Sequence, residues 1–290
     1  MFDIWLPLLG GLVLLVSGGE LLVRGAVQVA ERLGISPLVI GLTLVGFGTS
    51  MPELVTSVRA ALAGSPGIAF GNIVGSNIAN ILLIVGISSL LLPIAVTSAA
   101  LRRDAAVMLA TAVVFAVASA VMPMGRGVGA VFLAALVGYI ILAIRQERTA
   151  APHGALHDKG AALMGADPLL HAPSPSAGTL LAPLAVAVAG LVFVILGGGF
   201  FVDGAVGLAR SFAISETVIG LTVVALGTSM PELVTSVLAA MRKQSDIAFG
   251  NIVGSNIYNI LGIGGTTALI SPSVVPAEIV SFDNLVMLGV

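Results

Sequence analysis

The chain has 290 residues, of which 58% are hydrophobic and only 9% are charged, and its net charge at pH 7 is −2. Soluble domains carry roughly 25% charged residues, so a fold this poor in charge could not cover its surface in water, and residence in a membrane is predicted. The near-neutral charge and the 5% aromatic content exclude a basic or stacking surface for nucleic acid. Cysteine is absent from the sequence, which excludes disulfides and thiolate metal sites.

Apolar stretches long enough to span a bilayer recur along the sequence. A spanning helix needs about 20 apolar residues. A first set of spans is expected near 5–27, 36–63, 68–93, 101–123 and 127–145, and a second set near 180–208, 214–241, 247–271 and from about 279 to the end. The first stretch has no basic segment before it, so we expect a spanning helix rather than a cleaved signal.

A polar segment rich in Pro, Gly and Ala, residues 146–178, separates the two sets. It holds the three histidines of the chain, His153, His157 and His171, but no carboxylate spacing beside them supports a metal site. We expect a linker. Nine of the 12 Lys and Arg residues fall on one side of the membrane if the N-terminus is outside. The positive-inside rule then predicts a cytoplasmic linker and a multi-pass protein of the plasma membrane.

The sequence repeats itself at an offset of 179 residues. Residues 35–84 and 214–263 are identical at 36 of 50 positions without a gap. Five expected spans separate each position from its copy, and an odd number inverts the second copy in the membrane. The predicted fold is therefore an all-α integral membrane protein of two inverted five-helix repeats, with the first repeat at 1–145, the linker at 146–178 and the second repeat at 179–290. At this offset residues 112–145 have no counterpart, so we expect the second repeat to be truncated in its ninth helix.

The motif GTSMPELVTS occurs once in each repeat and places Glu53 and Glu232 deep within spans. A carboxylate at bilayer depth costs about 2.5–3.5 kcal/mol on insertion scales, so each is a candidate functional group. Thr and Ser precede each glutamate by four and three residues, which puts hydroxyls on its helical face. The proline of each motif lacks a backbone N–H, which frees a carbonyl one turn earlier. Carboxylate, hydroxyl and carbonyl oxygens together are the ligands of a hard cation such as Ca²⁺.

A second duplicated motif, GNIVGSN, supplies small and polar residues. Its glycines allow a neighbouring helix to approach closely. For Asn72, Asn77, Asn251 and Asn256, interhelical hydrogen bonding and ion coordination are equally open interpretations of the sequence.

These two duplicated motifs resemble the alpha-repeats of the cation/calcium exchanger superfamily, particularly prokaryotic calcium/sodium antiporters. The resemblance covers most of the chain. It implies ten helices, of which the broken second, third, seventh and eighth enclose the ion site, while the first and sixth slide against that core. It implies that the cation ligands are Glu53, Glu232, Thr49, Thr228, Ser50, Ser229, Ser76, Ser255, Asn80 and Asn259, with the carbonyls of Gly46 and Ala225.

The sequence departs from the pattern at one position, since several calcium exchangers of this superfamily carry Asp where this chain has Asn259. The predicted function is Na⁺-driven Ca²⁺ export by alternating access, with Ca²⁺, Na⁺ and the lipid bilayer as partners and no cofactor. The alternatives are an H⁺- or K⁺-coupled antiporter of Ca²⁺ or another cation, a passive channel, and an inactive truncated form. The sequence has no nucleophile–base pair or phosphate loop, so an enzyme is not expected.

Overall fold

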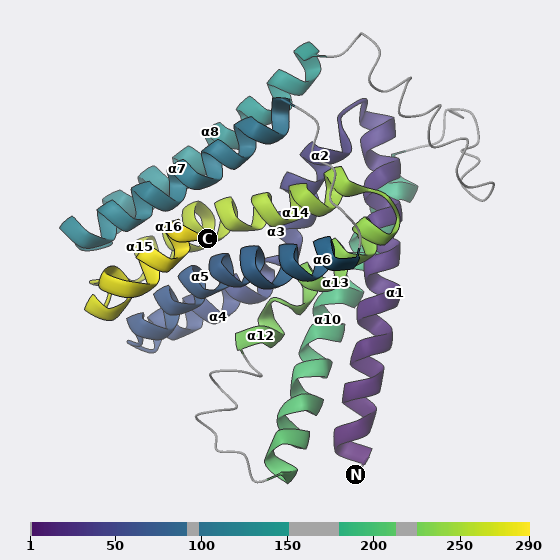
Figure 1. Ribbon diagram of the computed structural model, residues 1–290, viewed down its shortest axis with the longest axis horizontal. Helices are drawn as coiled ribbons and strands as arrows, with labels where there is room; N and C mark the ends of the chain where they lie inside the picture. The colour runs from purple at the N-terminus through teal and green to yellow at the C-terminus, as the bar shows by residue number, and fades with distance from the viewer. Residues whose placement is uncertain (1, 92–98, 151–179, 213–224) are drawn as a thin grey trace.

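A computed structural model describes residues 2–91, 99–150, 180–212 and 225–290 (Figure 1). Within these ranges the only β-structure is an isolated antiparallel bridge between Met124 and Ser273. The first-repeat helices are α1 (Phe2–Leu33), α2 (Pro37–Ile40), η1 (Gly41–Val45), α3 (Gly46–Thr49), α4 (Met51–Leu62), α5 (Pro66–Ala79), η2 (Asn80–Val85), α6 (Gly86–Leu91), α7 (Ala99–Val121) and α8 (Arg126–Ala150). The second-repeat helices are α10 (Leu181–Ser211), α12 (Ala225–Thr228), α13 (Met230–Met241), α14 (Ser245–Ile257), η5 (Tyr258–Gly264), α15 (Gly265–Ile270), η6 (Ile279–Asp283) and α16 (Asn284–Gly289), where η marks a π-helical segment.

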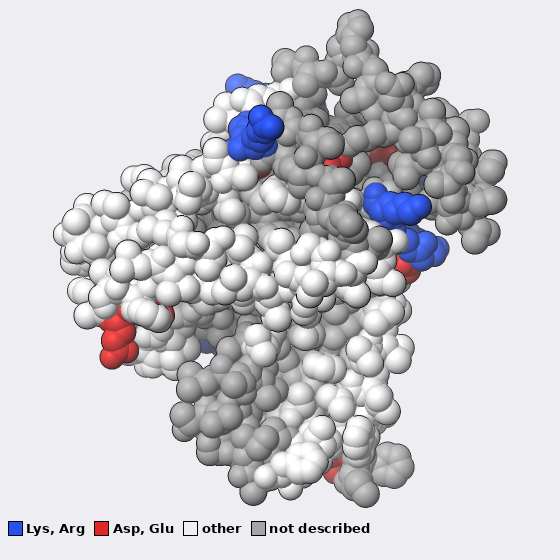
Figure 2. Space-filling model, viewed as in Figure 1, with Lys and Arg blue, Asp and Glu red and all other residues white. Residues whose placement is uncertain are grey.

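Five described helical segments are long and apolar enough to cross a membrane, and a sixth candidate is a pair bent by 44°. The straight segments are Asp3–Leu33, Pro66–Leu91, Arg102–Val121, Arg126–Gln146 and Leu181–Leu208, and the bent pair is Pro37–Thr49 with Met51–Leu62. Figure 2 agrees, because on the visible face most charged side chains of the described residues lie toward the upper, right and lower-left margins and the broad middle is mostly uncharged. The all-α membrane fold predicted from the sequence is confirmed.

Two parts of the predicted organisation fall partly outside the described ranges. Helix α8 continues to Ala150, five residues beyond the expected end of its span, and 151–179 of the expected linker lie outside the described residues. Residues 214–224 of the span expected at 214–241 also lie outside them, and the rest of that span forms α12 and α13. The expected orientation of the termini stays a prediction.

Helices α1 and α10 occupy equivalent positions in the two repeats and pack side by side along glycines (Figure 1). A Cβ added to Gly11 would lie 2.8 Å from the carbonyl oxygen of Gly197, and one added to Gly18 would lie 2.9 Å from that of Gly190. Higher residue numbers in α1 therefore pair with lower residue numbers in α10, so the two helices run antiparallel. The inverted relation of the repeats, inferred from an odd number of spans, is consistent with this packing.

The end of α13 is tied to α1 by charge. Arg242 donates from Nε to Oε2 of Glu20 at 3.1 Å and from a second nitrogen to Oε1, which Arg24 also contacts. All three side chains are partly exposed, and exposed pairs contribute about 0–1 kcal/mol. The cluster therefore fixes the register of α1 against α13 more than it stabilises the fold.

Helix α14 crosses α2 and η1 at backbone contact. A Cβ on Gly250 would lie 2.6 Å from the carbonyl oxygen of Leu38, and one on Gly254 would lie 2.6 Å from that of Leu42. The close approach expected of the second GNIVGSN motif is therefore observed. For the first motif the equivalent partner segment is 216–224, which lies outside the described residues.

We expect Gly254→Ala to lower the stability of the protein by about 1–3 kcal/mol, because overpacking against rigid backbone forces the helices apart. The measurement is the melting temperature in detergent. Gly138→Ala in α8 is the matched control, since its Cβ would meet nothing within 4 Å. Equal melting temperatures for the two variants would contradict the proposed close contact.

Candidate cation site

The two glutamates of the duplicated motif each lie close to the start of a helix. Glu53 lies in the first turn of α4 and Glu232 in the first turn of α13. Ser50 (φ −81°, ψ 9°) and Ser229 (φ −87°, ψ 5°) interrupt the helix just before each of them. The following proline suits this place, because the first turn of a helix has no partner for its N–H groups. Each carboxylate therefore lies at the N-terminal end of a helix, where the helix dipole is positive.

The glutamates receive hydrogen bonds from the opposite repeat. Ser50 Oγ donates to Glu232 Oε1 at 2.9 Å, and Ser229 Oγ donates to Glu53 Oε1 at 3.2 Å. The donor in each pair stands three residues before the glutamate of its own repeat. The two GTSMPE motifs therefore meet, and both carboxylates, each 1% exposed, are brought to the interface between the repeats.

Asparagines of the GNIVGSN motifs brace the glutamate helices. Asn72 Nδ2 donates to the carbonyl oxygen of Glu53 at 3.1 Å and to Ser57 Oγ at 2.9 Å. The second repeat repeats this contact: Asn251 Nδ2 donates to the carbonyl oxygen of Glu232 at 3.3 Å and to Ser236 Oγ at 2.9 Å. For Asn72 and Asn251 the structure thus shows interhelical hydrogen bonds, one of the two interpretations that the sequence left open.

Ser57 and Ser236 are buried residues that the sequence analysis did not select. They are the last residues of the two LVTS segments, directly after the glutamates. The sequence could have indicated them, because each stands four residues after a glutamate and so shares that glutamate's face of the helix.

The hydroxyl and carbonyl groups expected at the site lie around the same interface. Thr49 Oγ1 donates to Asn251 Oδ1 at 3.0 Å, and Ser255 Oγ donates to the carbonyl oxygen of Gly46 at 3.3 Å. Ser76 is buried on α5. The two hydrogen bonds join α3 to α14.

The remaining expected residues divide into two groups. Thr228 is half-buried at the end of α12, and Ala225 begins that helix. Asn80 and Asn259 are each 1% exposed and lie in the first turn of the π-helical segments η2 and η5. A π-helical turn is often found at functional sites. Here two such turns carry the two asparagines that the superfamily resemblance assigns to the ion site.

Several buried oxygens at this interface have no hydrogen-bond partner within the described part of the chain. They are Glu53 Oε2, Glu232 Oε2, Asn80 Oδ1 and Asn259 Oδ1. An unsatisfied buried acceptor costs about 1–3 kcal/mol, and a charged one costs more. A cation coordinated by these oxygens would remove that cost. In the same ranges no group of three or more His, Cys, Asp or Glu side chains is found, so amide and hydroxyl oxygens would complete the coordination, as a hard cation allows.

A family model for sodium/calcium exchanger proteins matches residues 4–145 and 182–290. The chain belongs to the sodium/calcium exchanger family. It is 35% identical over 311 residues to the sodium/calcium exchanger MaX1 of Methanosarcina acetivorans, covering 99% of this chain and 88% of that protein. It is 38% identical over 289 residues to the inner membrane protein YrbG of Escherichia coli, covering 97% and 84%.

A solved structure of the sodium-calcium exchanger NCX_Mj, soaked with Na⁺ and Ca²⁺, has the same fold. The TM-score is 0.79 at 30% sequence identity, and the match covers 97% of this chain and 87% of that one. The chain is therefore an integral membrane cation antiporter with the exchanger fold, and its family is one of transporters rather than enzymes.

We expect the Ser50–Glu232 contact to appear as energetic coupling between repeats. The test is a double-mutant cycle of Ser50→Ala and Glu232→Ala. The double variant should lose about 1–2 kcal/mol less stability than the sum of the two single variants, because both substitutions remove the same hydrogen bond. Unfolding in detergent gives the four values. Pairing Ser50→Ala with Glu53→Ala is the control and should be closer to additive; a larger coupling in that pair would contradict the cross-repeat assignment.

Proposed function

We propose that this exchanger moves Ca²⁺ out of the cell in return for Na⁺, by alternating access at a site that Glu53 and Glu232 share. The observation that carries the proposal is the mutual donation between the repeats, Ser50 to Glu232 and Ser229 to Glu53. It holds two buried carboxylates at one interface, each with an unpartnered oxygen in the described structure. Inverted-repeat transporters place substrate sites at such interfaces.

The charge of this site supports exchange. Two ionised glutamates neutralise one Ca²⁺ or two Na⁺, so the two cations compete for the same oxygens. With neither bound, two bare carboxylates in a low-dielectric environment would oppose each other and resist passage through an occluded state. Movement without a cation is thereby suppressed, and the transport of one ion is coupled to the return of the other.

The paired helices α1 and α10 are the proposed moving part. Their glycine contacts join them at backbone distance, so they can move as one body against the helices that hold the site. Both reach the glutamate regions, since α1 packs on α13 and α10 packs on α3 and α12. We further propose that the N-terminus is outside, that 146–178 is a cytoplasmic linker and that 1–145 and 179–290 are the two repeats.

The full set of proposed cation ligands is the one that the superfamily resemblance implied. The members with most support are the two glutamates and the two π-helix asparagines, because each has a buried oxygen without a hydrogen-bond partner among the described residues. Asn259 leaves the site with two carboxylates, which favours a total bound charge of two.

Glu53→Gln and Glu232→Gln should each abolish Na⁺-dependent Ca²⁺ uptake, because each removes half of the charge that neutralises the ion. The assay is radioactive Ca²⁺ uptake into proteoliposomes loaded with Na⁺. Glu278→Gln, at an exposed glutamate, is the matched control and should transport as the wild type does.

The same assay distinguishes Na⁺ coupling from coupling to H⁺ or K⁺. Uptake that is driven by an outward H⁺ or K⁺ gradient, and not by Na⁺, would contradict Na⁺ coupling. Uptake without any counter-ion gradient would indicate a channel. A wild-type protein with no uptake under any gradient would contradict transport by this chain.

Asn259→Asp should raise the Na⁺ concentration that half-inhibits Ca²⁺ uptake, because a third carboxylate attracts a divalent ion about twice as strongly as a monovalent one. The change is read from Na⁺ competition curves at fixed Ca²⁺. Asn284→Asp, which alters a buried asparagine bonded to Ser119, is the control. If both variants shift the curve equally, Asn259 does not contact the transported ion.

A further inference from the structure

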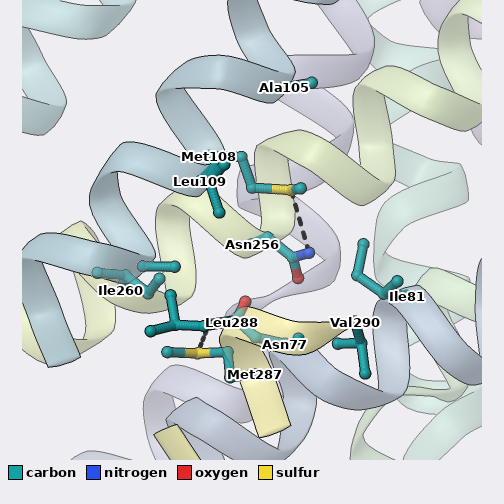
Figure 3. A pocket seen from close by; sticks show the side chains of 12 residues that line it. Asn77, Ile81, Ala105, Met108, Leu109, Asn256, Ile260, Met287, Leu288 and Val290 are labelled. Carbon is teal, nitrogen blue, oxygen red and sulfur yellow. Dashed lines mark hydrogen bonds between the residues drawn. The ribbon is translucent and has the colours of Figure 1, made fainter. Parts of the chain in front are cut away.

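A cavity of about 350 Å³ lies between α5, α7, α14 and α16 (Figure 3). Two methionines line it, Met108 on α7 and Met287 on α16, with Asn77 and Asn256 between them. The methionines are repeat equivalents, since 108 and 287 differ by the same 179 residues that relate the motifs. Neither methionine was selected from the sequence.

Each methionine accepts a hydrogen bond from an asparagine of the other repeat. Asn256 Nδ2 donates to the Met108 sulfur at 3.3 Å, and Asn77 Nδ2 donates to the Met287 sulfur at 3.8 Å. Figure 3 draws both contacts as dashed lines. The pattern of mutual donation between repeats seen at the glutamates therefore recurs at the methionines.

From Met108 the hydrogen bonds continue toward the proposed cation site. Asn256 Oδ1 accepts from Asn80 Nδ2 at 2.8 Å. The other end of the Asn80 amide, Oδ1, is buried and has no hydrogen-bond partner in the described part of the chain. The series runs Met108 to Asn256 to Asn80, and its last atom is an oxygen available to a cation.

The direction of this series follows from the chemistry of its first member. A thioether sulfur accepts hydrogen bonds and cannot donate them, so Asn256 must turn its NH₂ group toward Met108. The Asn256 carbonyl oxygen then faces Asn80, which must donate a hydrogen bond to it from its own NH₂ group. The Asn80 carbonyl oxygen is consequently directed away from Asn256. A side chain without an acceptor at position 108 would leave both amides free to turn over.

We propose that Met108 is a positioning residue for cation binding, which orients the Asn256 and Asn80 amides so that the Asn80 oxygen faces the ion. This rests on the proposed function, because it takes the ion site around Glu53 and Glu232 as given. The equivalent series from Met287 stops earlier: within the described ranges Asn77 Oδ1 and Asn259 Oδ1 both lack partners. Met287 thus orients Asn77 alone, and the two methionines have different consequences for Asn80.

The test is equilibrium binding of radioactive Ca²⁺ to the full chain in detergent, which needs no transport. Met108→Leu, similar in volume but without an acceptor, should raise the Kd for Ca²⁺ on the order of fivefold, the effect of one net hydrogen bond. Met108→Gln, of similar length, should recover part of the affinity that Met108→Leu loses, because its carbonyl oxygen can accept from Asn256 in the wild-type orientation although its NH₂ group does not enforce that orientation. In an Asn80→Ala background, Met108→Leu should change the Kd no further, because its effect passes through Asn80.

Met287→Leu is the comparison variant, measured in the wild-type and in the Asn80→Ala background. It should change the Kd for Ca²⁺ by the same factor in both backgrounds, because Met287 does not act through Asn80. The proposal is overturned if Met108→Leu binds as the wild type does, if Met108→Gln loses as much affinity as Met108→Leu, or if Met108→Leu and Asn80→Ala are additive. These outcomes leave the proposed function intact. Wild-type protein that does not bind Ca²⁺ would instead overturn the proposed function, and this inference with it.

Discussion

The arrangement of the molecule depends on two hydrogen bonds that cross between its halves. Each joins a serine of one GTSMPE motif to the glutamate of the other. Two carboxylates inside a membrane protein need donors, helix dipoles or cations around them, and here each repeat supplies the donor that its counterpart needs. The breaks before α4 and α13 fall at these two serines, so the groups that cross between the repeats stand where the helix is interrupted.

Close packing makes these crossings possible. The glycines of α1 and α10 let two long helices touch along their backbones, and Gly250 and Gly254 bring α14 against α2 and η1. A Cβ at Gly11, Gly18, Gly250 or Gly254 would lie within 3 Å of backbone atoms across the interface, so the helices would have to move apart. In a bilayer the hydrophobic effect does little to press helices together, so contact of this kind, with hydrogen bonds between amides and hydroxyls, sets how the repeats fit.

Much of this was predictable from the sequence, for identifiable reasons. The spans follow from apolar length, the inversion from an odd count of spans, and the glutamates from charge placed where charge is costly. Asn72 and Asn251 could not be assigned, because an amide both donates and accepts and only the surroundings decide its direction. Met108 and Met287 gave no signal of their own, since an apolar residue in an apolar helix is ordinary. Their significance comes from the asparagines that they face, and that pairing is tertiary.

The reciprocity of the contacts also bears on how such a chain could arise. Ser50 and Ser229, Glu53 and Glu232, and Met108 and Met287 are identical residues in equivalent places. Two copies of one ancestral half, inserted in opposite orientations, would therefore have satisfied the same contacts as a homodimer. Gene fusion would then have required a connecting segment rather than a new binding chemistry. Fusion would also have allowed each copy to acquire substitutions independently. Tyr258 is an example, since the equivalent residue of the first repeat is Ala79.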